Sequence, residues 1–141
     1  MILQRQDLEF STDKPISVCD MTPKVQEAVK RMRILNGLLM IASLHTTLAL
    51  VINERCEKLR EDMVVFLTRL APPTAKYRHN EIAIDGRPNA HSHLLSLLLP
   101  SQVTVAVKEG EMDLGQWQSI FAVELDGPRT LRKIRLTFVG D

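Results

Sequence analysis

The sequence predicts a single α+β domain in which helices pack on a mixed or mostly antiparallel β-sheet. Two segments with helical periodicity, residues 22–36 and 55–70, lie among strand-like segments in the first part of the chain. The last third contains strand-like segments joined by turns, which is typical of antiparallel hairpins. A length of 141 residues fits one unit with its own hydrophobic core, so we expect residues 1–141 to form one domain.

The first half of the chain alternates strands and helices. Thr22 can cap the free backbone donors of a helix, and Pro23 suits its first position. The Asn-Gly pair at residues 36–37 is expected to end that helix. Two apolar runs follow, which we interpret as buried strands. The predicted elements are a strand at Ile2–Ser11, the helix at residues 22–36, and strands at Leu38–Leu44 and Leu48–Ile52.

A second helix and an antiparallel unit make up the rest of the chain. Apolar residues recur at steps of three and four from Arg55 to Leu70 and predict an amphipathic helix. The turn-rich segment up to Pro88 is expected to be a mobile loop. Asn89 can cap a third helix that runs through Leu94–Leu99. The predicted strands that follow are Val103–Val107, Gly115–Leu125 and Thr130–Val139, with turns at residues 108–111 and 126–129.

Composition and charge exclude several classes of function. The formal net charge is +1, so no global field attracts nucleic acid or anionic lipid. The basic residues of Leu131–Arg135 alternate along a strand, which indicates a solvated face rather than a nucleic-acid site. Apolar runs such as Leu94–Leu99 are too short to span a membrane. Because Cys19 and Cys56 form no CxxC pair and no signal peptide is recognisable, we expect reduced thiols and a cytoplasmic location.

All four histidines fall in three short polar segments of the chain, at His45, His79, and His91 with His93. Imidazole is the usual proton donor and acceptor near neutral pH and the commonest nitrogen ligand for metals. A chain that used histidine only as a surface residue would be expected to scatter it. The clustering therefore indicates one functional site.

Five separated motifs carry a resemblance to a known family. They are His45–Thr47, Ile52–Glu54, Asn89–His93, Leu114–Gln118 and Glu124–Arg129. In this order they resemble the YjbQ family, also called the secondary thiamine-phosphate synthase family. The resemblance implies a compact α+β protein that assembles as a homotrimer, gathers these motifs in a cleft and has a weak thiamine-phosphate synthase activity.

The chain departs from the family pattern at three places. Ser92 stands where the family usually has alanine, Glu57 where an aspartate is common, and Leu99-Pro100-Ser101 where a Leu-Gly-x-Ser turn is usual. Ser92 adds a hydroxyl group near the expected site. Pro100 affects the geometry of the turn after the third helix more than the chemistry of the site.

The candidate metal ligands are His45, His91 and His93, with zinc or magnesium as the ion. His91 and His93 face the same side only in an extended backbone, because on a helix they diverge by about 200°. With Asn89 as a cap, the same residues lie near a helix start and can bind phosphate instead. In the third alternative, one histidine packs in the core and the other is exposed.

The candidate acid and base residues are Glu54, Asp62 and His79. Glu54 and Asp62 are eight residues apart, or about two helical turns, and share a face if both are helical. That alignment fails if Glu54 precedes the helix, and Asp62 is then an ordinary solvated charge. His79 lies in the loop, where it can close over a substrate or stay exposed and idle.

The remaining polar residues of the motifs are candidates for binding phosphate or substrate. The threonine hydroxyls can donate to phosphate oxygens or bond locally in a turn. Gln118 must point away from its neighbour Trp117, which we expect in the core. Arg129 offers a planar fork for an anion but also belongs to a turn. The candidates are Thr46, Thr47, Asn53, Asn89, Gln118 and Arg129.

These observations lead to two hypotheses of function. The first is a small soluble enzyme that acts on a phosphorylated metabolite through a histidine-rich metal or phosphate site. Its thiamine-phosphate synthase activity is a secondary one, because the sequence has no Gly-rich phosphate loop and no dense carboxylate cluster. The alternative is a non-catalytic protein that binds a metal or metabolite, which would explain the lack of a recognisable nucleophile motif.

Overall fold

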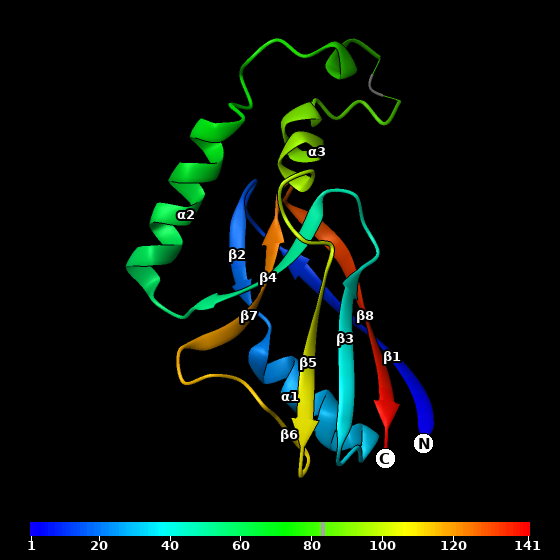
Figure 1. Cartoon of the computed structure of the whole chain (residues 1–141). Coiled ribbons are helices and arrows are strands. Elements are labelled where there is room, and N and C mark those ends of the chain that lie inside the picture. The colour runs from blue at the N-terminus through cyan, green and yellow to red at the C-terminus, as the bar shows by residue number, and fades with distance from the viewer. Residues whose placement is uncertain (83) are drawn as a thin grey trace.

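The computed structural model describes residues 1–82 and 84–141 and confirms an α+β fold built on antiparallel sheets (Figure 1). A five-stranded sheet has the order β1-β8-β3-β5-β6, and a three-stranded sheet has the order β2-β7-β4. In chain order the elements are β1 (Ile2–Thr12), β2 (Ser17–Asp20), α1 (Thr22–Met32), β3 (Gly37–Ser43), β4 (Leu48–Glu54), α2 (Glu57–Leu70), the 3-10 helix η1 (Arg78–Ile82), α3 (Ala90–Ser96), β5 (Gln102–Lys108), β6 (Glu111–Met112), β7 (Gln118–Glu124) and β8 (Arg129–Gly140).

Several connections between the two sheets lie at the same end of the molecule. The turn at residues 44–47 joins β3 to β4, and the turn at residues 125–128 joins β7 to β8. The backbone N–H of Leu125 donates to the carbonyl of Thr47 at 3.1 Å, which ties the two turns together. α3 lies beside these turns, at the upper end in Figure 1. This end of the molecule therefore collects loops from both sheets.

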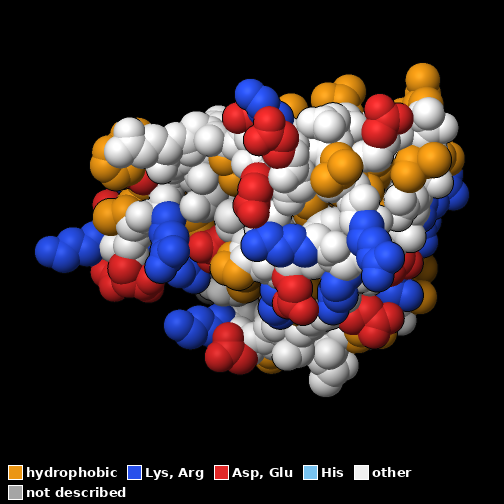
Figure 2. Space-filling view, turned by 90° about the horizontal axis from the view of Figure 1, so that it is seen from below, with side chains coloured by type: hydrophobic (Ala, Val, Ile, Leu, Met, Phe, Trp, Pro, Cys, Tyr) orange, Lys and Arg blue, Asp and Glu red, His pale blue; other side chains and the backbone are white. Residues whose placement is uncertain are grey.

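The core follows from the alternation of side chains along the strands. In β3, Leu39 and Ile41 are fully buried, whereas Leu38, on the opposite face of the strand, is 58% exposed. In β8, Ile134, Leu136 and Phe138 share the buried face. α1 covers this cluster with three fully buried side chains, Val25, Ala28 and Val29. On the face seen in Figure 2, basic and acidic side chains are interspersed.

Two short strands and two helix boundaries differ from the predictions. β2 and β6 were not predicted, because four and two residues are too few for a clear period. Met21 occupies the N-cap position of α1, and Thr22 instead accepts a hydrogen bond from the Ile120 backbone at 2.8 Å. α1 ends at Met32, where Arg33 adopts a left-handed conformation with φ 55°, so residues 36–37 do not end it.

The region around α2 and α3 corrects further expectations. β4 continues to Glu54, and α2 begins only at Glu57 after the N-cap residue Cys56. Glu54 therefore precedes the helix, and its predicted alignment with Asp62 is wrong. Trp117 is 68% exposed and not in the core. α3 ends at Ser96, and no helix in the described ranges is long and apolar enough to cross a membrane.

Candidate functional site

A buried ion pair between Glu124 and Arg132 lies next to the two turns. Glu124 at the end of β7 is fully buried and accepts hydrogen bonds from the Nε and Nη2 atoms of Arg132 in β8. Thr12 donates to the same carboxylate at 2.8 Å, and Arg132 also donates to Thr47 Oγ1 at 3.0 Å. Burial alone would raise the pKa of Glu124, but the hydrogen bonds and the charge of Arg132 outweigh it and lower the pKa. Thr47 therefore helps to hold the Glu124–Arg132 ion pair in place.

Asp126, two residues further on, holds three side chains from different parts of the chain. Arg87 donates from Nη2 at 3.0 Å, Asn89 from Nδ2 at 2.8 Å, and Arg129 from Nη2 at 2.7 Å. Burial would raise the pKa of Asp126, but these three hydrogen bonds lower it below its ordinary value. Two guanidinium groups share one carboxylate here, so the cluster keeps a positive charge.

His79 joins this network through Asn89. Its Nε2 lies 3.1 Å from Asn89 Oδ1. Because the amide nitrogen of Asn89 donates to Asp126, Oδ1 is the atom that accepts, and His79 Nε2 must carry a hydrogen. Asn89 occupies the N-cap position of α3, but its side chain makes no capping hydrogen bond there. The predicted cap residue instead connects η1 with the turn after β7.

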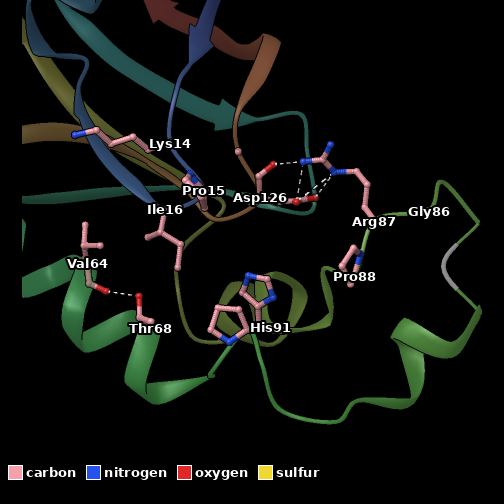
Figure 3. A pocket seen from close by; sticks show the side chains of 12 residues that line it. Lys14, Pro15, Ile16, Val64, Thr68, Gly86, Arg87, Pro88, His91 and Asp126 are labelled. Carbon is pink, nitrogen blue, oxygen red and sulfur yellow. Dashed lines mark hydrogen bonds and ion pairs between the residues drawn. The ribbon is translucent and has the colours of Figure 1, made fainter.

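A cleft with a volume of about 670 Å³ lies between α2, α3, the segment after β1 and the loop at residues 86–88 (Figure 3). His91 is 8% exposed and lines this cleft. Burial lowers its pKa, so its ring is neutral at neutral pH. Its Nδ1 has no hydrogen-bond partner among the described residues. The polar residues that line the cleft are Lys14, Thr68, Arg87, His91 and Asp126.

His45 and His93 border a different cavity of about 410 Å³, together with Thr46 and the apolar Leu48. His45 Nε2 accepts a hydrogen bond from the backbone N–H of Lys133 at 2.9 Å. Its pKa is lowered, first by burial and then by the charge of Arg132. The ring of His93 meets that of His79 edge-on, with 5.0 Å between the centroids. The helix α3 thus separates His91 from His93.

The structure brings only some of the predicted site residues together. Within residues 1–82 and 84–141, no three His, Cys, Asp or Glu side chains are placed to hold one metal ion. The helical backbone of α3 directs His91 and His93 to different cavities, and His45 Nε2 already has a partner. A shared metal on His45, His91 and His93 therefore does not fit a single chain.

Four predicted residues lie away from the histidines. Glu54 pairs with Gln118 at one end of the β4·β7 ladder, whereas Leu48 pairs with Glu124 at the other. Seven residues of strand separate the two ends by about 20 Å. Asn53 lies beside Glu54, and Asp62 is exposed on α2. Arg129 does bind an anionic group, but that group is Asp126 of the same chain.

Several important residues were not among the predicted ones. Lys14, Arg87 and Asp126 line the cleft, and the Glu124–Arg132 pair supports it. Asp126 belonged to a motif interpreted mainly as a turn. One signal was present for Arg132, because it precedes Ile134 and Leu136 on the same face of a strand. A charged residue on an otherwise apolar strand face indicates a buried partner.

The fold and the site define a class of small α+β proteins in which two antiparallel sheets meet beneath a cleft that contains a buried histidine. Residues 6–141 match the sequence profile of the UPF0047 protein YjbQ-like family, and the chain belongs to this family. The family resemblance of the five motifs is thereby confirmed.

Relatives and solved structures agree with this assignment over nearly the whole chain. A UPF0047 protein of Methanothermobacter thermautotrophicus is 42% identical over 140 residues, covering 99% of this chain and 94% of the relative. A YjbQ-like protein of Sulfolobus solfataricus P2 has a similar structure, with a TM-score of 0.91, 34% identity and 99% coverage of both chains. A protein of Aeropyrum pernix K1 gives a TM-score of 0.90 and 34% identity, over 98% of this chain and 99% of the other.

Proposed function

We propose that this protein is a small enzyme that binds a phosphorylated metabolite in the cleft beside His91 and removes a proton from it. The observation that supports this most directly is the buried Nδ1 atom of His91, which has no partner among the described residues. The His91 side chain lines a cleft together with the cationic residues Lys14 and Arg87. A neutral imidazole with a free acceptor is suited to general base catalysis near neutral pH.

Lys14 and Arg87 suit the anionic part of such a ligand. Lys14 is exposed at the rim, and Arg87 shares the Asp126 carboxylate with Arg129, so positive charge is in excess. Guanidinium and ammonium groups both bind phosphate well. A volume of about 670 Å³ is in the range of sites for small metabolites. Asp126 is a poor base, because its pKa is lowered and its oxygens accept hydrogen bonds from three side chains.

A thiamine-phosphate synthase activity, implied by the resemblance, would be a second reaction in the same cleft, because it displaces pyrophosphate instead of removing a proton. Its leaving group is pyrophosphate, and cations stabilise the charge that develops on the leaving oxygens. Lys14 and Arg87 are the groups placed to do so. The three predicted metal ligands do not fit one ion within the described residues of a single chain, so the role proposed for Lys14 and Arg87 does not depend on a metal. A divalent metal and a homotrimer stay predictions, which metal analysis and sedimentation would test.

The test compares turnover and binding of a panel of phosphorylated metabolites, including the substrates of thiamine-phosphate synthesis. We expect His91→Gln to lower kcat by about 10²- to 10⁴-fold, the usual contribution of a general base. For substrates that lose a proton, Lys14→Met should raise KM with little change in kcat, because it removes only a contact to the anionic group. Lys58→Met on the exposed side of α2 is the matched control and should change neither.

The outcomes separate the proposed enzyme from a non-catalytic binding protein. Binding that Lys14→Met weakens, without turnover of any compound, would favour a metabolite-binding protein. Full activity of the His91→Gln variant would show that His91 is not the base. A panel without any binding would reject an anionic ligand altogether.

A further inference from the structure

We propose that Ser92 holds His91 in the tautomer that carries its hydrogen on Nε2, so that the cleft selects anions able to donate a hydrogen bond. Protonated phosphate is such an anion, and sulfate is not. The anionic nature of the ligand rests on the proposed function, whereas the assignment of the tautomer rests on the hydrogen bonds of Ser92 alone.

The hydroxyl group of Ser92 has two neighbours and only one hydrogen. Its oxygen lies 2.5 Å from the carbonyl oxygen of Leu125, in the turn after β7. A carbonyl can only accept, so the hydroxyl hydrogen must point to Leu125. The second neighbour is His91 Nε2, at 3.3 Å from Ser92 Oγ. With its hydrogen already used, Ser92 Oγ accepts there and His91 Nε2 donates.

Burial of Ser92 leaves its hydroxyl group no alternative hydrogen-bond partner in solvent. Ser92 is 0% exposed, so water does not compete for its hydroxyl group. A neutral imidazole with its hydrogen on Nε2 leaves a lone pair on Nδ1. This atom is buried and has no partner among the described residues, which is costly for an acceptor. The proposed ligand occupies the cleft that His91 lines and supplies the missing hydrogen to Nδ1.

Lys14 and Arg87 attract any small anion, but His91 Nδ1 distinguishes between anions. Phosphate near neutral pH carries at least one O–H group, which can donate to Nδ1. Sulfate has the same tetrahedral shape and no hydrogen, so its oxygens would face the lone pair. A buried hydrogen bond made in one complex and missing in the other corresponds to about 10- to 100-fold in affinity.

The experiment uses the whole chain with ¹⁵N-labelled histidine at pH 7.5. The ¹⁵N chemical shifts of the two ring nitrogens report which of them carries the hydrogen. We expect His91 to be protonated on Nε2 only, and inorganic phosphate to shift its Nδ1 signal. Sodium sulfate at the same ionic strength should bind at least about 10-fold more weakly.

Ser92→Ala removes the acceptor of His91 Nε2 and should produce a mixture of tautomers and a weaker preference for phosphate over sulfate. Ser96→Ala, on the same helix, is the matched control, because its hydroxyl donates to the carbonyl of Thr46 and does not contact His91. The control should keep both the tautomer and the preference.

A wild-type His91 with its hydrogen on Nδ1 would overturn the proposal, and this holds even if Ser92→Ala does not fold. An unchanged tautomer in a folded Ser92→Ala variant would show that Ser92 does not set it. Equal affinity for phosphate and sulfate would reject the selectivity. If neither anion shifts the His91 signals, the proposed anionic ligand fails as well, whereas the tautomer result still decides the role of Ser92.

Discussion

At the scale of single residues, the charges beneath the cleft differ from those on the surface. Arg132 and Arg135 lie on the same strand, and each pairs with a carboxylate from another strand. The Arg132–Glu124 pair is 3% and 0% exposed, whereas the Arg135–Asp7 pair is 42% and 31% exposed. A buried charge that loses its partner cannot be solvated, so the same substitution should have different effects at the two positions.

We therefore expect Arg132→Met to lower the free energy of unfolding by about 3–5 kcal/mol, because it leaves Glu124 buried without its cation. Arg135→Met should cost at most about 1 kcal/mol, since solvent screens that pair. Urea denaturation of both variants measures the difference. The double variant Arg132→Met with Glu124→Met should regain much of the loss, because no buried charge remains. Equal costs for the two single variants would contradict the argument.

The histidines show which features of the candidate site can be predicted from the sequence. The structure places His45, His79 and His91 at the same end of the molecule, near the turns and α3, but in different cavities, so the single site expected from the clustering stays a prediction. The clustering did not predict that His91 and His93 serve different cavities, because this depends on the helical backbone at residues 90–96. The tautomer of His91 depends on Leu125, which lies 33 residues from Ser92 and carries no sequence signal.

At the scale of elements, the turn between β7 and β8 places the cleft against the segment after β1. Gly127 donates from its backbone N–H to the carbonyl of Pro15 at 2.9 Å. A Cβ atom at Gly127 would lie 2.0 Å from the carbonyl oxygen of Lys14. No side chain can be accommodated there unless the two backbone segments separate. The close approach of the segments, and not a left-handed conformation, requires glycine at this position.

Gly127→Ala should therefore destabilise the protein by about 3 kcal/mol, at the upper end of the cost of an overpacked site. It should also weaken ligand binding, since Lys14 and Gly127 both line the cleft. Gly115→Ala is the control, because the nearest atom there is the flexible end of Gln118 at 3.2 Å, and its cost should stay below about 1 kcal/mol. Thermal unfolding of both variants tests this. A Gly127→Ala variant as stable as the control would show that the turn can move freely.

Elements with a clear period were predictable, and those defined by pairing alone were not. The helix at 55–70 and the strand at Thr130–Val139 match α2 and β8 closely, because their apolar residues repeat over several turns or pleats. The sequence leaves the conformation of Asn53 and Glu54 open, and their pairing with β7 makes them strand residues. β2 and β6 owe their conformation to their neighbours in the same way.

At the scale of the whole molecule, folding brings two histidines into surroundings that disfavour their charged form. Burial is the main cause at both His45 and His91, and it lowers both pKa values. The carboxylates of Glu124 and Asp126 are held charged beside them by Arg132, Arg87 and Arg129. The folded protein therefore combines neutral imidazoles with ionised carboxylates at the same end of the sheets.

This combination predicts how stability depends on pH. As the pH falls below about 6.5, unfolded histidines take up protons that the folded state does not, so the free energy of unfolding decreases. The loss continues until the pH reaches the lowered pKa values of the folded state, and a second loss follows below about pH 4.5, where the carboxylates of unfolded chains become protonated. Urea denaturation between pH 8 and pH 3 should show both steps. His91→Gln removes one of the two histidines and should reduce the slope of the first step while leaving the second. A free energy of unfolding that stays constant from pH 7 to pH 5 would show that neither imidazole resists protonation in the folded protein.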